Sequence, residues 1–440
     1  MTQTATPQTD APAVPAIFEP IEINGVRVRN RLILPPMCQY SCEARDGVPH
    51  GWHFQHLGAR AAGGFGIVVA EATAVTPEGR ISAWDTGLWN DEQRDAWAPI
   101  AEFIASQGAL PAIQLGHAGA KASTVPMHPG APAGQPILEG PDSWETLSPS
   151  GVATNSMEIR THAMRVDEIR ETVQAFADAA ERADRAGFGA VQLHAAHGYL
   201  LSTFLSPLTN QRTDAYGGSA ENRFRIVREI IEQTRERVPA SFAIGIKLNS
   251  SDYVKGGLSE EDALQNVRWL AETHMVDFVE VSGGTYEKPA MFAEADAPKQ
   301  SASSHRREGF FASFAKRAHE VMPAGSKMRI IVTGGFRSRV GMAQAVRDDA
   351  IDGIGQMKKA LPAARIYFWG DRPETFAGGK VHAKVAVADE RICFISSANL
   401  TGHAMEKNIE AGVLISGGSI PRNLHRHLEA LDTARVITSV

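Results

Sequence analysis

Residues 190–199 read AVQLHAAHGY, a short apolar run that ends in two histidines and a tyrosine. The segments on either side of it, 167–186 and 220–237, carry apolar side chains at helical spacing. A buried strand between amphipathic helices is the repeating unit of a parallel sheet that is covered on both faces. The same alternation recurs from Phe18 to Gly355, which predicts that this part of the chain is built from βα units.

Eight apolar runs fit the description of a buried strand. They lie at 31–35, 67–71, 111–115, 190–194, 243–248, 277–281, 329–333 and 351–355. The segments with helical spacing between them are 91–107, 167–186, 220–237, 260–273, 310–321 and 339–347. This pattern favours a (β/α)₈ TIM barrel over an open doubly wound sheet, because the glycine-rich turn expected after the first strand of such a sheet is absent.

The residues at the ends of the predicted strands form a candidate site. They are Pro35, Pro36, Met37, Cys38 and Tyr40 after the first strand, Ala72 after the second, Gln114 in the third, His194, His197 and Tyr199 after the fourth, Lys247 in the fifth, and Gly334 and Gly335 after the seventh. Barrel enzymes build their active sites at these ends, so the side chains should converge. Since no carboxylates cluster there, glycoside hydrolysis by paired acids and a hard-metal site are both disfavoured.

His194 and His197 lie three residues apart at a strand exit, so both imidazoles, neutral or charged, could donate hydrogen bonds to one carbonyl oxygen. Tyr199 could then supply a proton to the carbon that becomes electron-rich. Two alternatives stay open: one histidine is a satisfied core residue, or both bind a metal together with His117 or Cys38. The ligand set is loose and lacks a second shell of carboxylates, so we predict carbonyl binding and no metal.

Gln114 and Lys247 suit a flavin. An amide can hydrogen-bond the pyrimidine edge of the ring, and a cation beside that edge stabilises the negative charge of the reduced form. Each of the two alone could equally be a polar cap or a surface cation. Gly334 and Gly335 would permit close approach of the backbone to a phosphate, whereas Cys38 taken alone reads as a small buried apolar residue.

Six stretches resemble the Old Yellow Enzymes, especially the bacterial branch with a cysteine near the flavin. They are PPMCQYS (35–41), EATAVTPEGRIS (71–82), IQLGHAGAKAS (113–123), HAAHGYLLSTFLSPLTNQRTDAYGGSAENR (194–223), IGIKLNSSDY (244–253) and VTGGFRSR (332–339). The resemblance implies a (β/α)₈ barrel that holds FMN, is reduced by NAD(P)H, and passes hydride to the β-carbon of an enone or a similar α,β-unsaturated carbonyl compound.

The resemblance also implies a role for each matching residue. Pro35, Pro36, Met37 and Cys38 would lie along the flavin, Ala72, Gln114 and Lys247 would contact FMN, Tyr40 would face the substrate, His194 and His197 would bind the carbonyl oxygen, and Tyr199 would donate the proton. Cys38 would lie near the redox-active ring.

The resemblance ends at the eighth strand. The family continues from there into a Gly-Arg phosphate loop and a closing helix, whereas Gly355 is followed here by Gln-Met-Lys-Lys. We therefore expect a disordered tail at 1–17 and a barrel at 18–355 that lacks its normal last helix. A lost charge-assisted bond to the phosphate would cost roughly 1.5–3 kcal/mol.

Residues 356–440 resemble part of a phospholipase D-like α/β domain, its C-terminal half. The stretches VHAKVAVAD (381–389), ISSANLT (395–401) and NIEAGVLI (408–415) approximate one His-x-Lys-x₄-Asp motif with a downstream Ser-x-Asn. The resemblance implies that His382 attacks a phosphodiester, Lys384 holds the phosphate, Asp389 orients the imidazole and Asn399 assists. The alternative is a polar face on an alternating strand. One motif is half of such a site, so activity would require a dimer.

Three functions follow from these observations: an FMN-dependent ene-reductase, a dimeric phosphodiesterase with the barrel as passenger, and a non-functional chimera of two interrupted domains. The chimera is favoured by the absence of a Pro/Gly/Ser linker at 353–360. The oxidoreductase is favoured, because six motifs match the barrel family and only one motif, half of a site, matches phospholipase D.

Charge and composition narrow the choice of partners. The net charge is −6, and residues 356–440 hold 11 Lys or Arg and 8 Asp or Glu, a local charge of +3 that leaves −9 for the rest. Neither part is typical of a nucleic-acid binder. No run approaches the ~18 apolar residues of a membrane helix, and three cysteines are too few for a disulfide scaffold. We expect a cytoplasmic protein with a small-molecule substrate, and homo-oligomer formation stays open.

Overall fold

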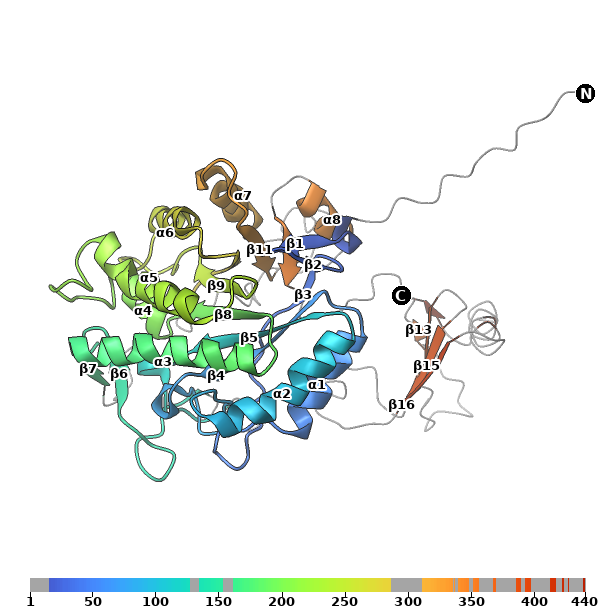
Figure 1. The fold of residues 1–440 in the computed structure, drawn as a ribbon, viewed down its shortest axis with the longest axis horizontal. Helices are drawn as coiled ribbons and strands as arrows, with labels where there is room; N and C mark the ends of the chain where they lie inside the picture. Colours follow the sequence, from blue (N-terminus) through green and yellow to red (C-terminus); the bar gives the residue numbers. More distant parts are fainter. Residues whose placement is uncertain are drawn as a thin grey trace, which may run out of the picture. The chain divides into compact units, whose positions relative to one another are not determined.

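The computed structural model describes most of the chain up to Gly355 and short segments beyond it. The described residues are 16–126, 134–152, 161–285, 311–334, 336, 339–347, 351–355, 367–368, 385–388, 392–396, 412–416, 422, 426 and 438–439. The chain divides into two compact units, Met1–Lys358 and Lys359–Val440. In the first unit, parallel strands close into a barrel with helices around it (Figure 1).

All eight predicted barrel strands are confirmed. Around the barrel they are β3 (Leu32–Leu34), β4 (Ile67–Ala74), β5 (Leu110–Gly116), β8 (Ala190–Ala195), β9 (Ala243–Asn249), β10 (Phe278–Ser282), β11 (Arg329–Thr333) and β12 (Gly353–Gly355). The eighth strand, β12, begins two residues later than predicted and pairs with both β11 and β3. The ring is therefore closed by this short last strand.

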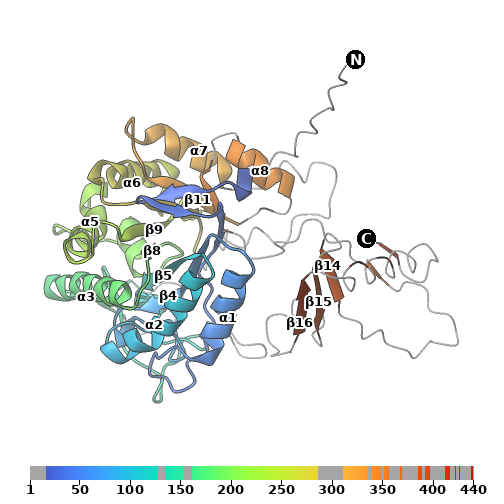
Figure 2. The same ribbon diagram turned by 45° about the vertical axis from the view of Figure 1, so that its right-hand side comes forward.

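The helices surround these strands (Figure 2). They are α1 (Gly51–Ala62), α2 (Asp91–Ser106), α3 (Val166–Arg185), α4 (Leu200–Leu205), α5 (Ala220–Arg237), α6 (Glu260–Thr273), α7 (Ala312–Val321) and α8 (Arg339–Arg347). Side-chain caps from Asn90, Ser219 and Ser259 begin α2, α5 and α6. The sequence did not predict α1, whose capping side chain is a histidine, or α4, which is buried on all sides and so has no polar face.

The remaining elements are short. They are the 3₁₀ helices η1 (Ala16–Phe18), η2 (Pro77–Gly79) and η3 (Gly119–Lys121), the hairpin β1 (Ile21–Ile23) and β2 (Val26–Val28), and the parallel pair β6 (Thr146–Ser148) and β7 (Thr161–Ala163). Ile17 is 2% exposed and belongs to the main core. Ala16 and Ile17 are therefore part of the barrel unit, two residues before the predicted boundary of the tail.

The barrel interior is apolar at one end and polar at the other. Apolar side chains of the strands pack with the β1–β2 hairpin; they include Ile33, Ile67, Ala112, Ala190, Ala243, Phe278 and Ile331. Because alternate residues of a strand face the same side, the residues two positions further on also face inward. Those residues include Gln114, Gln192, Glu280 and Thr333, and all four are buried. The apolar layer thus forms a floor beneath polar side chains at the strands' C-terminal ends.

Gly245 is required by the packing of this floor. It lies directly opposite Phe278 on the neighbouring strand, and a Cβ built on it would lie 2.1 Å from the Phe278 ring. We expect Gly245→Ala to lower the free energy of unfolding by about 1–3 kcal/mol, because the ring has no free space to move into. Urea unfolding would measure the loss. Gly51→Ala is the matched control, since a Cβ there meets no atom within 4 Å, and equal stability of the two variants would contradict this account.

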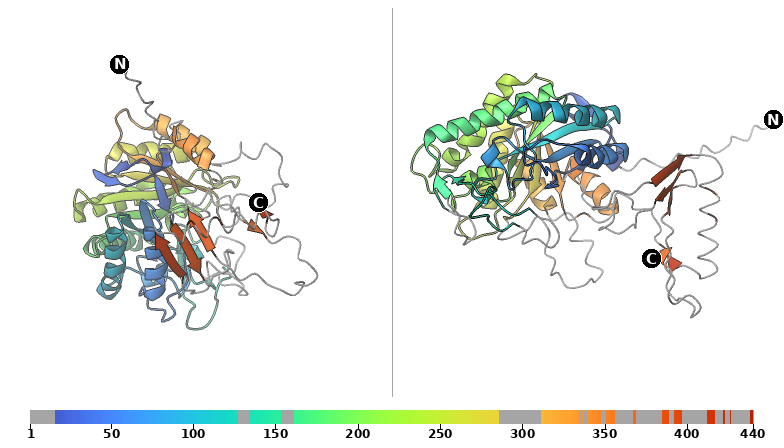
Figure 3. Two further views of the ribbon diagram at one scale, coloured as in Figure 1. Left: turned by 90° about the vertical axis from the view of Figure 1, so that its right-hand side faces the viewer. Right: turned by 90° about the horizontal axis from the view of Figure 1, so that it is seen from below.

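The described residues of the second unit form two small antiparallel sheets. The strands β14 (Val385–Ala388), β15 (Ile392–Ser396) and β16 (Gly412–Ser416) lie side by side (Figure 3), and β13 (Tyr367–Phe368) pairs with β17 (Thr438–Ser439). Each of β14, β15 and β16 overlaps one of the three stretches that resemble phospholipase D. The predicted half-site residues His382, Lys384, Asp389 and Asn399 lie outside the described residues, as do Gly335 and residues 356–366. The prediction of a missing last helix therefore stays a prediction.

Within the described ranges, no helix is both long enough and apolar enough to cross a membrane.

Candidate active site

The turn after β8 brings the two predicted histidines and the tyrosine together. The rings of His194 and His197 are 5.2 Å apart between centroids and nearly perpendicular, and the rings of His194 and Tyr199 are 4.8 Å apart. His197 has a left-handed backbone (φ +65°), and Gly198 follows at +78°. Such a conformation is unusual for a residue with a side chain and marks a sharply turned segment.

Hydrogen bonds from three other segments hold this turn. The backbone N–H of His197 donates to Asn249 Oδ1 at 3.1 Å, and Lys121 Nζ donates to the His197 carbonyl oxygen at 3.1 Å. The Gly198 N–H donates to Ser202 Oγ at 3.1 Å. Since β9, η3 and α4 each contribute a partner, the backbone of the turn is held by three separate elements.

Both histidines are neutral at physiological pH. Burial, and then the charge of Lys247, lowers the pKa of His194 to about 3. The pKa of His197 lies well below its usual range because of burial and then His194, Lys247 and Lys121. Of the two states that the sequence allowed, neutral and charged, the structure selects the neutral one.

The two histidine rings use different nitrogens for their hydrogen bonds within the protein. His194 Nδ1 accepts the N–H of Ala196 at 3.4 Å, so its proton lies on Nε2. His197 Nε2 is 2.8 Å from Ser282 Oγ. If Ser282 donates in that bond, the proton of His197 lies on Nδ1 and is available to a ligand. Ser282, at the end of β10, was not singled out by the sequence.

A recess beside these rings is lined by Ala72, Thr73, Ala74, Gly79, Ile81, Asp85, Gly116, His117, Ala118, His194 and Tyr199. Burial raises the pKa of Asp85 to about 7, and burial lowers the pKa of His117 to about 4. His117 Nδ1 accepts the Gly119 N–H at 3.0 Å, which leaves the proton on its buried Nε2. The recess is therefore lined by the neutral imidazoles of His117 and His194, by Tyr199 and by the carboxyl group of Asp85, beside an apolar strand edge.

Cys38, Tyr40 and Ala72 also meet. The Ala72 backbone and the Tyr40 side chain hydrogen-bond the Cys38 sulfur, but burial, and then Asp85 and Glu71, still hold the pKa of its thiol well above the usual range. Cys38 is therefore a protonated thiol at neutral pH, not a thiolate.

The other residues predicted after β3 and β11 lie at strand ends as expected. Pro35 is buried, whereas Pro36 and Met37 are half-buried in the loop after β3. Gly334 follows β11 with φ +104°, a conformation open to glycine.

A chain of buried polar contacts links β5, β8, β9, β10 and β11 around the barrel interior below the histidines. Gln114 Nε2 donates to Gln192 Oε1 at 2.6 Å, and Gln192 Nε2 donates to Glu280 Oε2 at 2.6 Å. Glu280 Oε1 accepts from Lys247 Nζ at 2.8 Å and from Thr333 Oγ1 at 2.5 Å. Lys247 is in turn the cross-strand neighbour of His194. Gln114, Lys247 and His194, predicted from three separate strands, thus belong to one connected group.

Sequence reasoning missed Gln192 and Glu280. Both lie within predicted strands, and a signal was present: Glu280 is the one charged residue in the apolar run 278–281 of a buried strand, where an unpaired charge would be costly. Strand alternation turns both Lys247 and Glu280 toward the barrel interior, so each could have been predicted as the partner of the other.

Within the described ranges, no three His, Cys, Asp or Glu side chains gather in a way that could hold a metal ion.

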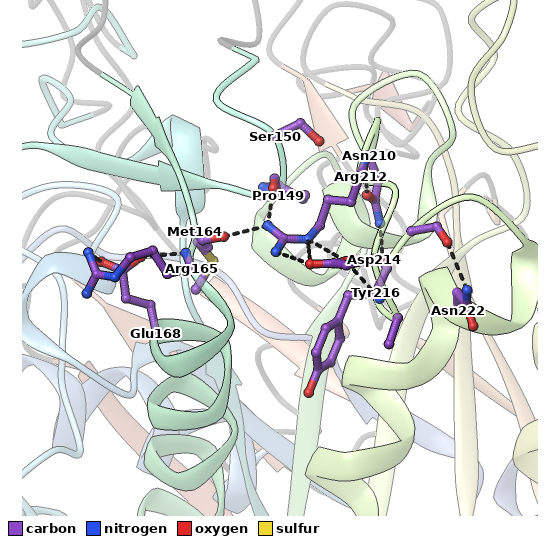
Figure 4. A network of polar contacts seen from close by, with 12 residues as sticks. Pro149, Ser150, Met164, Arg165, Glu168, Asn210, Arg212, Asp214, Tyr216 and Asn222 are labelled. Carbon is purple, nitrogen blue, oxygen red and sulfur yellow. Dashed lines mark hydrogen bonds and ion pairs between the residues drawn. The ribbon is translucent and has the colours of Figure 1, made fainter.

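The second part of the long fourth-strand motif builds a loop. The guanidinium of Arg212 donates to the carbonyl oxygens of Pro149 and Met164, and its Nε donates to Asp214 Oδ1 at 3.0 Å (Figure 4). The same Asp214 oxygen accepts the Tyr216 N–H at 3.0 Å. These bonds fasten the loop after α4 to the segments around β6 and β7, so part of the motif serves structure and not chemistry.

Two family models match the chain. The model described as the NADH:flavin oxidoreductase / NADH oxidase family matches residues 16–364, and the model described as cardiolipin synthase, PLD-like domain, matches residues 319–431. The two matches overlap at 319–364. In the structure, β11 and β12 from this overlap pair within the barrel, which assigns the stretch up to Gly355 to the first family's fold.

Individual proteins agree with the first match. The NADPH dehydrogenase of Bacillus pumilus is 41% identical over 268 residues, which cover 61% of this chain and 73% of that protein. The old yellow enzyme homologue from Zymomonas mobilis has a TM-score of 0.59 at 23% identity, covering 78% of this chain and 88% of that one. The structure of 2-naphthoyl-CoA reductase has a TM-score of 0.65 at 24% identity over 77% of this chain, which spans only half of that chain. At these identities the two structures establish the fold alone.

Proposed function

Because the chain belongs to the NADH:flavin oxidoreductase / NADH oxidase family, we propose that it uses FMN and NAD(P)H to reduce the C=C bond of α,β-unsaturated carbonyl compounds. The observation that carries the proposal is the buried cluster of His194, His197 and Tyr199 at the C-terminal end of β8. Neutral donors for a carbonyl oxygen lie there beside a phenol that can deliver a proton.

The polar residues at the barrel mouth fit the cofactor. One N–H of the Gln114 amide donates to Gln192. The carbonyl oxygen and the second N–H of Gln114 suit the alternating donors and acceptors of a flavin's pyrimidine edge. Lys247, on the neighbouring side, supplies a cation for the same edge. When bound, FMN supplies the hydride that the substrate's β-carbon receives. Cys38 as a neutral thiol and Ala72 offer small, uncharged surfaces for an apolar ring.

The two histidines would bind the substrate's carbonyl oxygen. Neutral imidazoles donate without adding charge, so the oxygen gains stabilisation as negative charge develops on it during the reaction. In this arrangement His194 uses Nε2–H, and His197 uses Nδ1–H while Ser282 donates to its Nε2. Tyr40 would face the same substrate, and Tyr199 would protonate the carbon next to the carbonyl group.

The test is the visible spectrum of the purified chain with added FMN. A yellow species that bleaches with NAD(P)H and regains colour with an enone would support the proposal. A chain that stays colourless after gel filtration would overturn it.

His194→Ala tests the carbonyl-binding role. We expect kcat/KM for an enone to fall by about 10²–10³-fold, the loss typical of one oxyanion donor, and the charge-transfer band of a bound phenol to weaken, since a phenolate oxygen occupies the same place as the carbonyl oxygen. His162→Ala is the matched control, because His162 lies in β7 and contacts Glu145 and Glu168 instead. Unchanged enone turnover and phenol binding in His194→Ala would remove His194 from the site.

The phosphodiesterase and chimera hypotheses rest on the sequence alone. The half-site of His382, Lys384, Asp389 and Asn399 lies outside the described residues, so no geometry supports a second function here.

A further inference from the structure

Glu280 is the most deeply buried charged side chain of the polar group below the histidines. It lies in the middle of β10 with 0% exposure and accepts hydrogen bonds from three donors: Lys247 Nζ, Thr333 Oγ1 and Gln192 Nε2. Lys247 Nζ can only donate, so the Glu280 oxygen 2.8 Å from it is the acceptor whatever the orientation of the Gln192 amide. Glu280 and Lys247 therefore form a buried ion pair, with Lys247 only 6% exposed.

This ion pair would determine how much positive charge a flavin edge beside Lys247 experiences. At 2.8 Å the carboxylate offsets most of the field of the Lys247 ammonium. A lone buried lysine at this place would stabilise negative charge on the reduced pyrimidine ring far more strongly than the pair does. Glu280 thus limits the effect of Lys247.

Glu280 also determines which way two amides point. An ionised carboxylate only accepts, so the Gln192 group facing Glu280 must be its NH₂. The Gln192 oxygen then faces Gln114, and Gln114 must donate to it. The Gln114 amide nitrogen is consequently the atom that faces Gln192, and the Gln114 oxygen would be the acceptor that it presents to a flavin. A neutral acceptor-donor group in place of Glu280 would no longer impose this order.

We propose that Glu280 is the positioning residue that sets the reduction potential of the bound flavin, by pairing Lys247 and by orienting Gln114 through Gln192. Because Glu280 is 0% exposed, it would act through Lys247 and Gln192 and not by its own contact with the flavin. This inference rests on the proposed function, because the flavin is the group that experiences both effects.

The test compares Glu280→Gln with Glu280→Asp. Glu280→Gln keeps the shape but removes the charge, so the equilibrium between oxidised and two-electron-reduced flavin should shift toward the reduced form by about tenfold, equivalent to about 30 mV. The affinity for sulfite, whose flavin adduct carries negative charge on the same ring edge, should rise in parallel. Glu280→Asp keeps the charge and shortens the arm, and it should stay close to the wild type in both measurements.

A purely structural role predicts the opposite order. Gln matches the volume and reach of Glu, so for a packing residue the Gln variant would resemble the wild type and the Asp variant would deviate. That order, or a potential unchanged in both variants, would overturn the inference.

Glu280→Gln leaves Lys247 buried without its counter-charge, which can prevent folding. The double variant Lys247→Met/Glu280→Gln removes both charges, so it should unfold at higher urea concentration than Glu280→Gln alone, and its flavin potential should be no higher than that of the wild type. If the double variant is less stable than Glu280→Gln, or has the higher potential, the ion pair is not the cause. A wild-type chain that fails to bind FMN would overturn the proposed function, whereas an FMN-binding wild type with unshifted variants overturns this inference alone.

Discussion

Replacing Tyr199 by Phe should slow the oxidation of the reduced enzyme by an enone by about 10²–10⁴-fold, the usual contribution of a general acid. The variant keeps the aromatic ring that packs at 4.8 Å from His194 and loses only the hydroxyl group. Reduction by NAD(P)H should keep its rate, because that step needs no proton from Tyr199. Rapid-mixing kinetics that follow the two half-reactions separately would measure both rates.

A one-electron acceptor such as ferricyanide provides the control for Tyr199→Phe. It takes electrons without protonation at carbon, so its rate should be the same in variant and wild type. If the Phe variant passes hydride to the enone at the wild-type rate, the proton comes from water or from another residue, and Tyr199 is no general acid here.

The barrel should lose stability steeply as the pH falls below about 6. Burial lowers the pKa of His56 to about 3, of His117 to about 4 and of His194 to about 3, and holds that of His197 well below its usual range. At pH 5 the unfolded chain binds protons at these positions that the folded chain excludes, so the free energy of unfolding falls as the pH falls. Each histidine contributes a slope of about 1.4 kcal/mol per pH unit.

Asp85 acts in the opposite direction. Burial raises the pKa of its carboxyl group to about 7, so between about pH 4 and 7 the folded chain holds a proton that the unfolded chain has released. Its contribution to stability therefore grows as the pH falls and offsets about one histidine. The net slope should be about 4 kcal/mol per pH unit between pH 6 and 5, enough to unfold a typical domain within a few units.

Urea titrations at a series of pH values would measure this slope. His56→Gln should reduce it by about 1.4 kcal/mol per pH unit, because His56 lies in α1, apart from the candidate active site, and is one of the four. His274→Asn, at an exposed left-handed position after α6, should leave the slope as it is. A stability that stays level from pH 7 to 5 would show that the four imidazoles accept protons in the folded state.

The strand pattern was readable from sequence because it depends on local periodicity. Apolar runs of five or six residues separated by amphipathic segments admit few arrangements, and all eight predicted strands are present in the closed barrel. The predicted helices were found to within about two residues, for example α5 (Ala220–Arg237), whereas α1 was not predicted. Helix α4 was not predicted, because it is buried on all sides and therefore shows no alternation of apolar and polar residues at helical spacing.

The candidate residues were readable for a second reason. Barrel topology brings all strand ends to one mouth, so His194, Lys247 and Gln114 could be grouped without knowing any distance. Their protonation states could not be predicted, because a pKa depends on burial and on neighbours from other strands. The sequence left charged and neutral imidazoles equally open, and only burial beside Lys247 decided for the neutral form.

By itself, then, the sequence determined the barrel and the types of side chain at its mouth, since both follow from period and position along single strands. Only the tertiary structure decided that Glu280 pairs with Lys247 and that Gln192 links Glu280 to Gln114. Those contacts join residues 33, 88 and 78 positions apart in the chain. Gln114 lies opposite Gln192, and Lys247 lies opposite Glu280, on neighbouring strands. Such contacts require a specific order and register of the strands, and no local pattern in the sequence carries that information.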